Sequence, residues 1–81
     1  MASFIEELNQ VFRAVFDDDT IEIYPELVSY HVPGWDSFSY VTLLMSIEDH
    51  FSIEFEAREV ANLPNVGALI TLVEKKLVAK K

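Results

Sequence analysis

The segment SFSYVTLLMSIEDHF, residues 37–51, carries two apolar stripes at helical spacing. One stripe repeats at i, i+3, i+4, i+7 and i+11, which is typical of a helix face packed in a core; it comprises Tyr40, Leu43, Leu44, Ile47 and Phe51. The second stripe, offset from the first, comprises Phe38, Val41 and Met45. A helix packed on one side cannot bury both stripes, so we expect exposed apolar surface near its start, where such patches often mark binding sites. The alternative is a helix wedged between neighbours with both faces buried.

Apolar periodicity predicts a second long helix over residues 4–16, upstream of this segment. Ser3 and Glu6 have the spacing of a capping box at its start, and the acidic run 17–19 ends it. A final helix is expected after Asn65, which can cap it. Its apolar positions again repeat at helical spacing and are Val66, Leu69, Ile70, Val73 and Leu77.

A short helix is expected over residues 56–63, with Ala57, Val60 and Ala61 facing inward and Pro64 stopping it. The connection 17–36 is long for a compact domain, and such connections usually have a function or local structure. Its apolar residues should pack on the core: Ile21, Ile23, Leu27, Val28 and Val32. The sequence therefore predicts one domain over residues 1–81, an all-α, small four-helix bundle of three longer helices and one short helix, with a long loop between helices one and two.

Charge narrows the classes of partner. Fourteen acidic residues face six basic ones, for a formal net charge of −8, and no Lys or Arg occurs between Ala14 and Ala57. An acidic body repels nucleic acid and anionic lipid, whereas basic surfaces on other proteins attract it. No apolar run is long enough for stable membrane insertion, and the start of the chain lacks the order of a signal peptide. The chain has no cysteine, which excludes disulfides and thiolate chemistry. The expected location is the cytoplasm, and the expected state is a monomer.

Catalytic and metal sites are not predicted. Ser37, His31, His50 and Asp36 supply the residue types of a hydrolase triad, but the Gly-x-Ser-x-Gly elbow is absent and 81 residues leave little room for a cleft. The acidic run 17–19 lacks the glycine and distal glutamate of a calcium loop. Trp35 and Tyr40 are interpreted as anchors that pack the loop against the helix.

The sequence Gly34-Trp35-Asp36-Ser37-Phe38 joins the long loop to the helix over 37–51. A phosphodiester on a serine at this position would meet unpaired backbone N–H groups and the positive end of the helix dipole. Taken without context, Asp-Ser before a helix is simply an N-cap.

The context is a resemblance to acyl carrier proteins. Asp36-Ser37-Phe38 is similar to their Asp-Ser-Leu motif, at the family's usual place after a long loop. The likeness continues through Leu43, Ile47-Glu48-Asp49, Phe51, Ile53, Asn65-Val66 and Leu69 and covers nearly the whole chain. The resemblance implies that the chain is not an enzyme. It implies that Ser37 is esterified with 4′-phosphopantetheine, derived from coenzyme A, whose thiol carries acyl groups as thioesters in fatty acid or lipid metabolism.

The same resemblance implies roles for other residues. Asp36 should contribute to recognition by the phosphopantetheinyl transferase that installs the arm. Acyl-loading and acyl-transfer enzymes with basic docking surfaces should contact the apolar residues Phe38, Val41 and Met45, rimmed by Asp36, Glu48 and Asp49. A sheltered acyl chain should lie among inward residues of two helices, namely Leu43, Leu44, Ile47, Leu69 and Val73.

Departures from the family pattern narrow this interpretation. Phe38 replaces the usual leucine, and Ser39 and Thr42 stand where carriers of ordinary fatty acid synthesis tend to have acids. With Trp35, these departures resemble specialised carriers of dedicated lipid or secondary-metabolite pathways. Two alternatives remain: an aminoacyl or peptidyl carrier, although the Gly-Gly-Asp-Ser typical of peptidyl carriers is absent, and an unmodified helical protein-interaction module.

Overall fold

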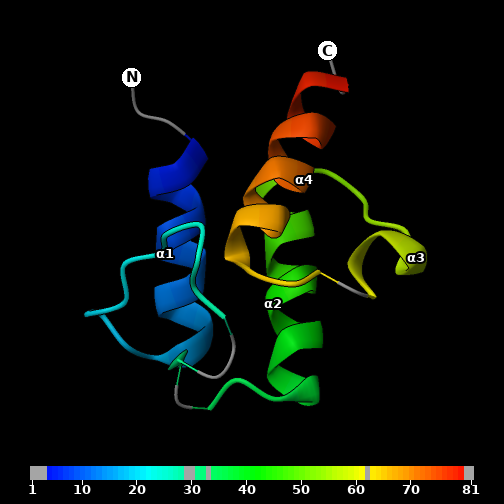
Figure 1. Cartoon of the computed structure of the whole chain (residues 1–81). Helices are drawn as coiled ribbons and strands as arrows, with labels where there is room; N and C mark the ends of the chain where they lie inside the picture. The colour runs from blue at the N-terminus through cyan, green and yellow to red at the C-terminus, as the bar shows by residue number, and fades with distance from the viewer. Residues whose placement is uncertain (1–3, 29–30, 33, 62, 80–81) are drawn as a thin grey trace.

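The computed structural model describes residues 4–28, 31–32, 34–61 and 63–79. Over these residues the chain forms helices α1 (Phe4–Phe16), α2 (Ser37–Phe51), α3 (Ala57–Val60) and α4 (Val66–Ala79), and no strand. The three long helices pack together and the short α3 lies at their side (Figure 1). The start of α1 and the end of α4 lie at one end of the molecule, and the start of α2 lies at the other (Figure 1). The predicted all-α four-helix plan is confirmed.

The long helices begin and end where the sequence predicts, because their ends have identifiable caps. Asp17 adopts a left-handed conformation (φ 51°) after α1, and the Asp18 N–H donates to the Arg13 carbonyl over 3.0 Å. Ser52 takes the same conformation after α2 (φ 57°). Left-handed residues of this kind close helix C-termini. At α4, the predicted cap is confirmed, since the Asn65 side chain accepts from the Ala68 N–H over 2.9 Å. The capping box expected at Ser3 lies outside the described residues.

The prediction for α3 was too long. Instead of spanning 56–63, the helix spans only Ala57–Val60, and none of its residues is buried. Ala57 and Ala61 are exposed rather than inward, and Val60 is half-buried. Glu56 and Glu59 form a reciprocal capping box at its start, but a single turn with no buried face has little to propagate it.

The core draws on α1, α2, α4 and the loops between them. Its buried residues are Leu8, Val11, Phe12, Ile21, Leu27, Val32, Leu43, Ile47, Phe51, Ile53, Val66, Leu69 and Val73. The predicted core stripe of α2 is confirmed, with Tyr40 and Leu44 half-buried against the same cluster. Of the five loop residues predicted to pack on the core, Ile21, Leu27 and Val32 are buried. The other two, Ile23 and Val28, are half-buried.

Main-chain hydrogen bonds hold the long loop to the helices. The Asn9 side chain accepts from the Ile23 N–H over 2.8 Å, which fixes the loop to α1. At the other side, the N–H groups of Val66 and Gly67 donate to the carbonyls of Leu27 and Pro25, both over 2.8 Å. These bonds satisfy donors at the start of α4 that have no partner within the helix.

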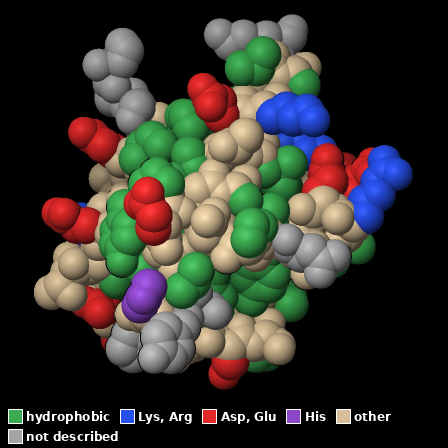
Figure 2. All heavy atoms as spheres, viewed as in Figure 1, with side chains coloured by type: hydrophobic (Ala, Val, Ile, Leu, Met, Phe, Trp, Pro, Cys, Tyr) green, Lys and Arg blue, Asp and Glu red, His purple; other side chains and the backbone are tan. Residues whose placement is uncertain are grey.

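Charge is unevenly distributed over the surface. On the face shown in Figure 2, Lys and Arg side chains gather over α3 and the later part of α4 with some Asp and Glu beside them, while other Asp and Glu side chains are scattered over the remaining face. No described helix is long and apolar enough to cross a membrane.

Candidate functional site at the start of helix α2

Asp36 and Ser39 cap α2. The Asp36 carboxylate accepts from the Ser39 N–H over 2.9 Å, and the Ser39 hydroxyl oxygen accepts from the Asp36 N–H over 2.8 Å. The Ser39 hydroxyl donates in turn to the Gly34 carbonyl over 2.8 Å. Gly34 itself lies at φ 88°, a conformation that a residue with a Cβ rarely adopts. The loop therefore enters the helix in one defined geometry.

Ser37 is the first residue of α2 and is exposed. The capping oxygen at this helix start comes from Asp36, so the Ser37 hydroxyl is not the N-cap group. It forms no hydrogen bond with any residue in the described part of the chain. The simplest structural role for Asp-Ser before a helix is thus filled by Asp36, and the Ser37 hydroxyl faces solvent.

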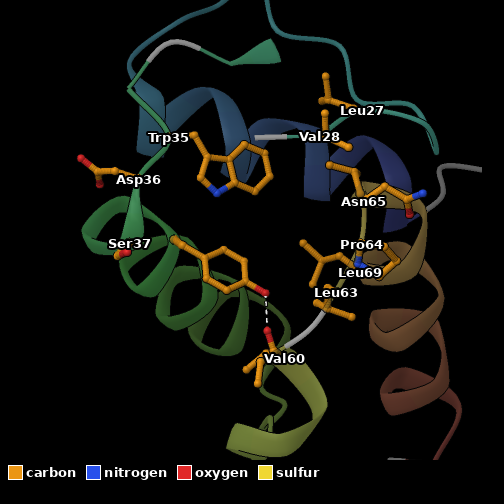
Figure 3. Close-up of a pocket in the computed structure, with 13 residues that line it drawn as sticks. Leu27, Val28, Trp35, Asp36, Ser37, Val60, Leu63, Pro64, Asn65 and Leu69 are labelled. Atoms are coloured by element: carbon orange, nitrogen blue, oxygen red, sulfur yellow. Dashed lines mark hydrogen bonds between the residues drawn. The ribbon is translucent and has the colours of Figure 1, made fainter. Parts of the chain in front are cut away.

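A cavity of about 270 Å³ adjoins Ser37. Figure 3 shows Trp35, Leu63 and Leu69 around this space, with Asp36 and Ser37 at its α2 edge. The lining comes from the long loop, the first turn of α2, the end of α3 and the start of α4: Leu27, Val28, Trp35, Asp36, Ser37, Tyr40, Val60, Ala61, Leu63, Pro64, Asn65, Val66 and Leu69.

Aromatic rings form one wall of this cavity. The indole of Trp35 stacks on the Tyr40 ring with centroids 6.3 Å apart, and its centroid lies 5.7 Å from that of Phe12 and 5.5 Å from that of Phe16. The prediction that Trp35 and Tyr40 anchor the loop against the helix is confirmed. Burial raises the pKa of Tyr40 above 10.0, so its hydroxyl is protonated at neutral pH and donates to the Val60 carbonyl over 2.7 Å.

The five residues expected around an acyl chain do not all reach this cavity. Leu69 lines it, whereas Leu43, Ile47 and Val73 are fully buried in the core and Leu44 is half-buried at its edge. The sequence analysis did not single out Val60, Leu63 and Pro64 as lining residues. All three residues precede Asn65, the predicted cap of α4. The segment that leads into this cap lies opposite the start of α2.

The second stripe of α2 forms an apolar ridge, defined here as Phe38, Val41 and Met45. These side chains are 82%, 54% and 62% exposed, so the predicted apolar surface beside the helix start is confirmed. The two acidic residues expected at its rim differ in their surroundings. Asp49 is exposed, but Glu48 is half-buried and its carboxylate accepts from the Phe55 N–H over 2.8 Å.

Comparisons with known proteins agree with this geometry. The family described as phosphopantetheine attachment site matches residues 33–73. An acyl carrier protein of Helicobacter pylori is 28% identical over 79 residues, covering 98% of this chain and 100% of the relative. Acyl carrier protein 3 of Ralstonia nicotianae is 26% identical over 76 residues, covering 94% and 87%. The solution structure of a holo acyl carrier protein from Geobacter metallireducens has a TM-score of 0.88 at 42% identity, covering 94% of this chain and 87% of that one.

The chain belongs to the acyl carrier protein family, which is defined by a phosphopantetheine attachment site. Acyl carrier proteins are carriers and not catalysts, which confirms the prediction that the chain is not an enzyme. Their cofactor is covalently bound 4′-phosphopantetheine. The start of α2 fits this group, since it offers an exposed hydroxyl that capping does not use and a cavity beside it.

Proposed function

We propose that Ser37 carries 4′-phosphopantetheine and that the protein holds acyl intermediates on it. The observation that carries this proposal is the exposed Ser37 hydroxyl at the first position of α2, beside a helix cap supplied by Asp36. Ser37 also lies within the matched segment 33–73. When bound, the arm supplies a terminal thiol that forms thioesters.

The residues around Ser37 have distinct roles in this proposal. The positive end of the α2 dipole stabilises a phosphodiester on Ser37. Asp36 fixes the first turn of the helix, so that the transferase meets Ser37 in one orientation. The adjoining cavity, lined mainly by apolar and aromatic side chains, provides a place where an acyl chain leaves water, at a gain of roughly 0.8 kcal/mol per buried methylene.

Partner enzymes dock on the apolar ridge. Phe38, Val41 and Met45 form an exposed line from the first to the third turn of α2. Asp36 lies exposed at the start of this helix and Asp49 lies exposed near its end. With a net charge of −8, the protein attracts transferases and acyl-transfer enzymes that carry basic surfaces. Apolar contacts surrounded by charge are the usual anatomy of such interfaces.

A specialised lipid or secondary-metabolite pathway is the setting that we propose. Support comes from the first turn of α2, which has no acidic residue, and from the size of Phe38 at the position next to Ser37. A partner must accommodate that ring, because Phe38 is 82% exposed. Partners that recognise acids in this turn would find none.

Intact mass spectrometry tests the attachment. After incubation with coenzyme A and a phosphopantetheinyl transferase, the wild type should gain one phosphopantetheinyl group and Ser37→Ala should gain none. Ser46→Ala, a matched serine change within α2, should gain one group like the wild type. Modification of Ser37→Ala would overturn the attachment site, and an unmodified wild type would favour an unmodified interaction module. Loading by aminoacyl but not acyl donors would favour an aminoacyl or peptidyl carrier.

A further inference from the structure

Helix α3 contributes Val60 to the wall of the cavity beside Ser37 and is itself loosely packed. None of its residues is buried, so polar contacts position it. Among the described contacts, two tie it to other helices. The Tyr40 hydroxyl on α2 donates to the Val60 carbonyl over 2.7 Å, and the Lys76 ammonium on α4 lies 2.8 Å from the Glu59 carboxylate. The remaining cavity walls include Val66 and Leu69, which are buried in the core.

Tyr40 acts at the cavity itself. Its ring lines the cavity together with Val60, and the dashed line in Figure 3 marks the hydrogen bond that joins them. The ring is half-buried and stacked on Trp35, so the hydroxyl is held in place. Its acceptor is a carbonyl at the C-terminal end of α3, where backbone carbonyls lack partners within the helix.

The cavity is partly open to solvent, and its volume limits how much of an acyl chain it shelters. A cavity of 150 Å³ holds a benzene molecule, so a volume of about 270 Å³ takes roughly ten carbon atoms on that scale. The carbons of a longer chain that remain sheltered must displace a wall, and the others extend through the open side into solvent. The core side is packed like the interior of any protein and resists displacement, whereas α3 buries no residue and is held by the two polar contacts with Tyr40 and Lys76.

We propose that Tyr40 is a specificity-determining residue, whose hydrogen bond to Val60 holds α3 against the side of the cavity and limits the sheltered part of an acyl chain to roughly ten carbons. The inference rests on the proposed function, since the chain must be attached at Ser37. It deepens that function by naming the class of cargo that this carrier shelters, which is short and medium-length acyl groups.

The test is a series of acyl-Ser37 proteins with chains of about four to about fourteen carbons. It uses the wild type, Tyr40→Phe and Tyr24→Phe as a matched control, because Tyr24 is exposed and does not line the cavity. Each methylene that enters the cavity raises the thermal midpoint. In the wild type and Tyr24→Phe, the midpoint should rise and then level off at about ten carbons. Unloaded Tyr40→Phe should melt about 4–8 °C lower, and its midpoint should keep rising beyond that length.

Two outcomes overturn the inference: the same plateau length in Tyr40→Phe and the wild type, or a flat series in both. Intact mass separates this from failure of the proposed function, since an inference that fails on proteins verified as loaded at Ser37 leaves the attachment standing. A second measurement needs no variant. The Glu59 N–H donates to the Glu56 carbonyl at this turn, and its hydrogen exchange in the wild type should be slower with short chains than once the chain exceeds the cavity. Exchange in α3 that is independent of chain length would contradict the proposal.

Discussion

Asp36 and Ser39 close the first turn of α2 on each other, each accepting a hydrogen bond from the other's backbone N–H. The residue between them that bears the candidate hydroxyl, Ser37, takes no part in this cap. Capping and cofactor attachment are therefore divided between neighbouring side chains, so a substitution can affect one without removing the other.

This cap should make stability depend on pH in acid. Hydrogen bonds from the Ser39 backbone N–H and hydroxyl hold the pKa of Asp36 below its ordinary 3.8. Because the folded pKa is lowered, the contribution is present above the unfolded value and is lost as pH falls through the folded value. Asp36→Asn keeps a capping oxygen but cannot titrate. We expect the advantage of the wild type over this variant, measured by urea denaturation, to shrink as pH is lowered from about 6 to about 3.

Ser39→Ala identifies the cause of that pH dependence. The variant loses the hydroxyl that donates to the Asp36 carboxylate over 3.2 Å, so the Asp36 pKa should rise toward 3.8 in a carboxyl NMR titration. An unchanged Asp36 pKa in Ser39→Ala would show that the side chain of Ser39 does not contribute to it.

Truncation of a side chain in the core stripe of α2 should lower stability, whereas truncation in the exposed stripe should slow docking. Ile47 is 0% exposed and Val41 is 54% exposed. Ile47→Val removes one buried methylene and should cost about 1 kcal/mol of unfolding free energy. Val41→Ala should change it by less than about 0.5 kcal/mol, since surface substitutions usually do, yet slow association with partner enzymes. Denaturant titration and stopped-flow association measure the two effects. A larger stability loss for Val41→Ala than for Ile47→Val would mean that the ridge is structural.

Substitution of the two acidic residues near the end of α2 should have different effects on stability. Glu48→Lys removes the acceptor of the Phe55 N–H, so it should cost about 1–3 kcal/mol as well as slow docking. Asp49→Lys should slow docking at low salt and leave stability nearly unchanged, because Asp49 is exposed. Asp19→Lys makes the same charge change in the loop and is the control. If Asp19→Lys and Asp49→Lys slow association equally, net charge rather than the α2 surface steers the encounter.

Replacement of Gly67 by alanine, which favours helix formation, should nevertheless lower stability. Alanine in place of glycine within a helix normally gains up to about 1 kcal/mol. Here a Cβ would lie 2.8 Å from the Pro25 carbonyl oxygen and 3.0 Å from its Cβ. We therefore expect Gly67→Ala to lose about 1–3 kcal/mol of stability, as overpacked sites do. Thr71→Ala, at an exposed position of α4, should be neutral or slightly stabilising in the same thermal melts. A stabilised Gly67→Ala would show that the loop moves aside without cost.

The helices that could be predicted from the sequence are those with strong local patterns. Helices α1, α2 and α4 each have an apolar stripe and a recognisable cap, so their bounds could be predicted. Helix α3 has neither a buried face nor a long apolar pattern, and its polar contacts are with Tyr40 and Lys76, which lie far from it in the sequence. The predicted span 56–63 therefore exceeded the helix that forms.

The candidate site also has parts that the sequence could predict and parts that it could not. Asp36 and Ser37 could be predicted because motif and helix start coincide in sequence. The cavity could not be predicted, since residues from four segments meet there and helical spacing indicates only that a side chain is inward. Leu43 and Val73, expected around an acyl chain, are buried in the core and do not line this cavity, so their contact with cargo stays a prediction. Glu48 resembles a surface acid in sequence, and only the folded loop brings the Phe55 N–H to it.

The main-chain bonds between the long loop and α4 bear on how such carriers diverge. Carbonyls at Pro25 and Leu27 hold the start of α4, and peptide groups are common to every residue type. Exposed loop positions such as Tyr24 and Glu26 are thus free to drift between lineages while the ends of distant helices stay joined. Position 67 cannot vary in this way, because the Cβ of any other residue there would clash with Pro25 of the loop. Among orthologues, the exposed residues of the loop should vary, whereas the glycine at position 67 should be retained.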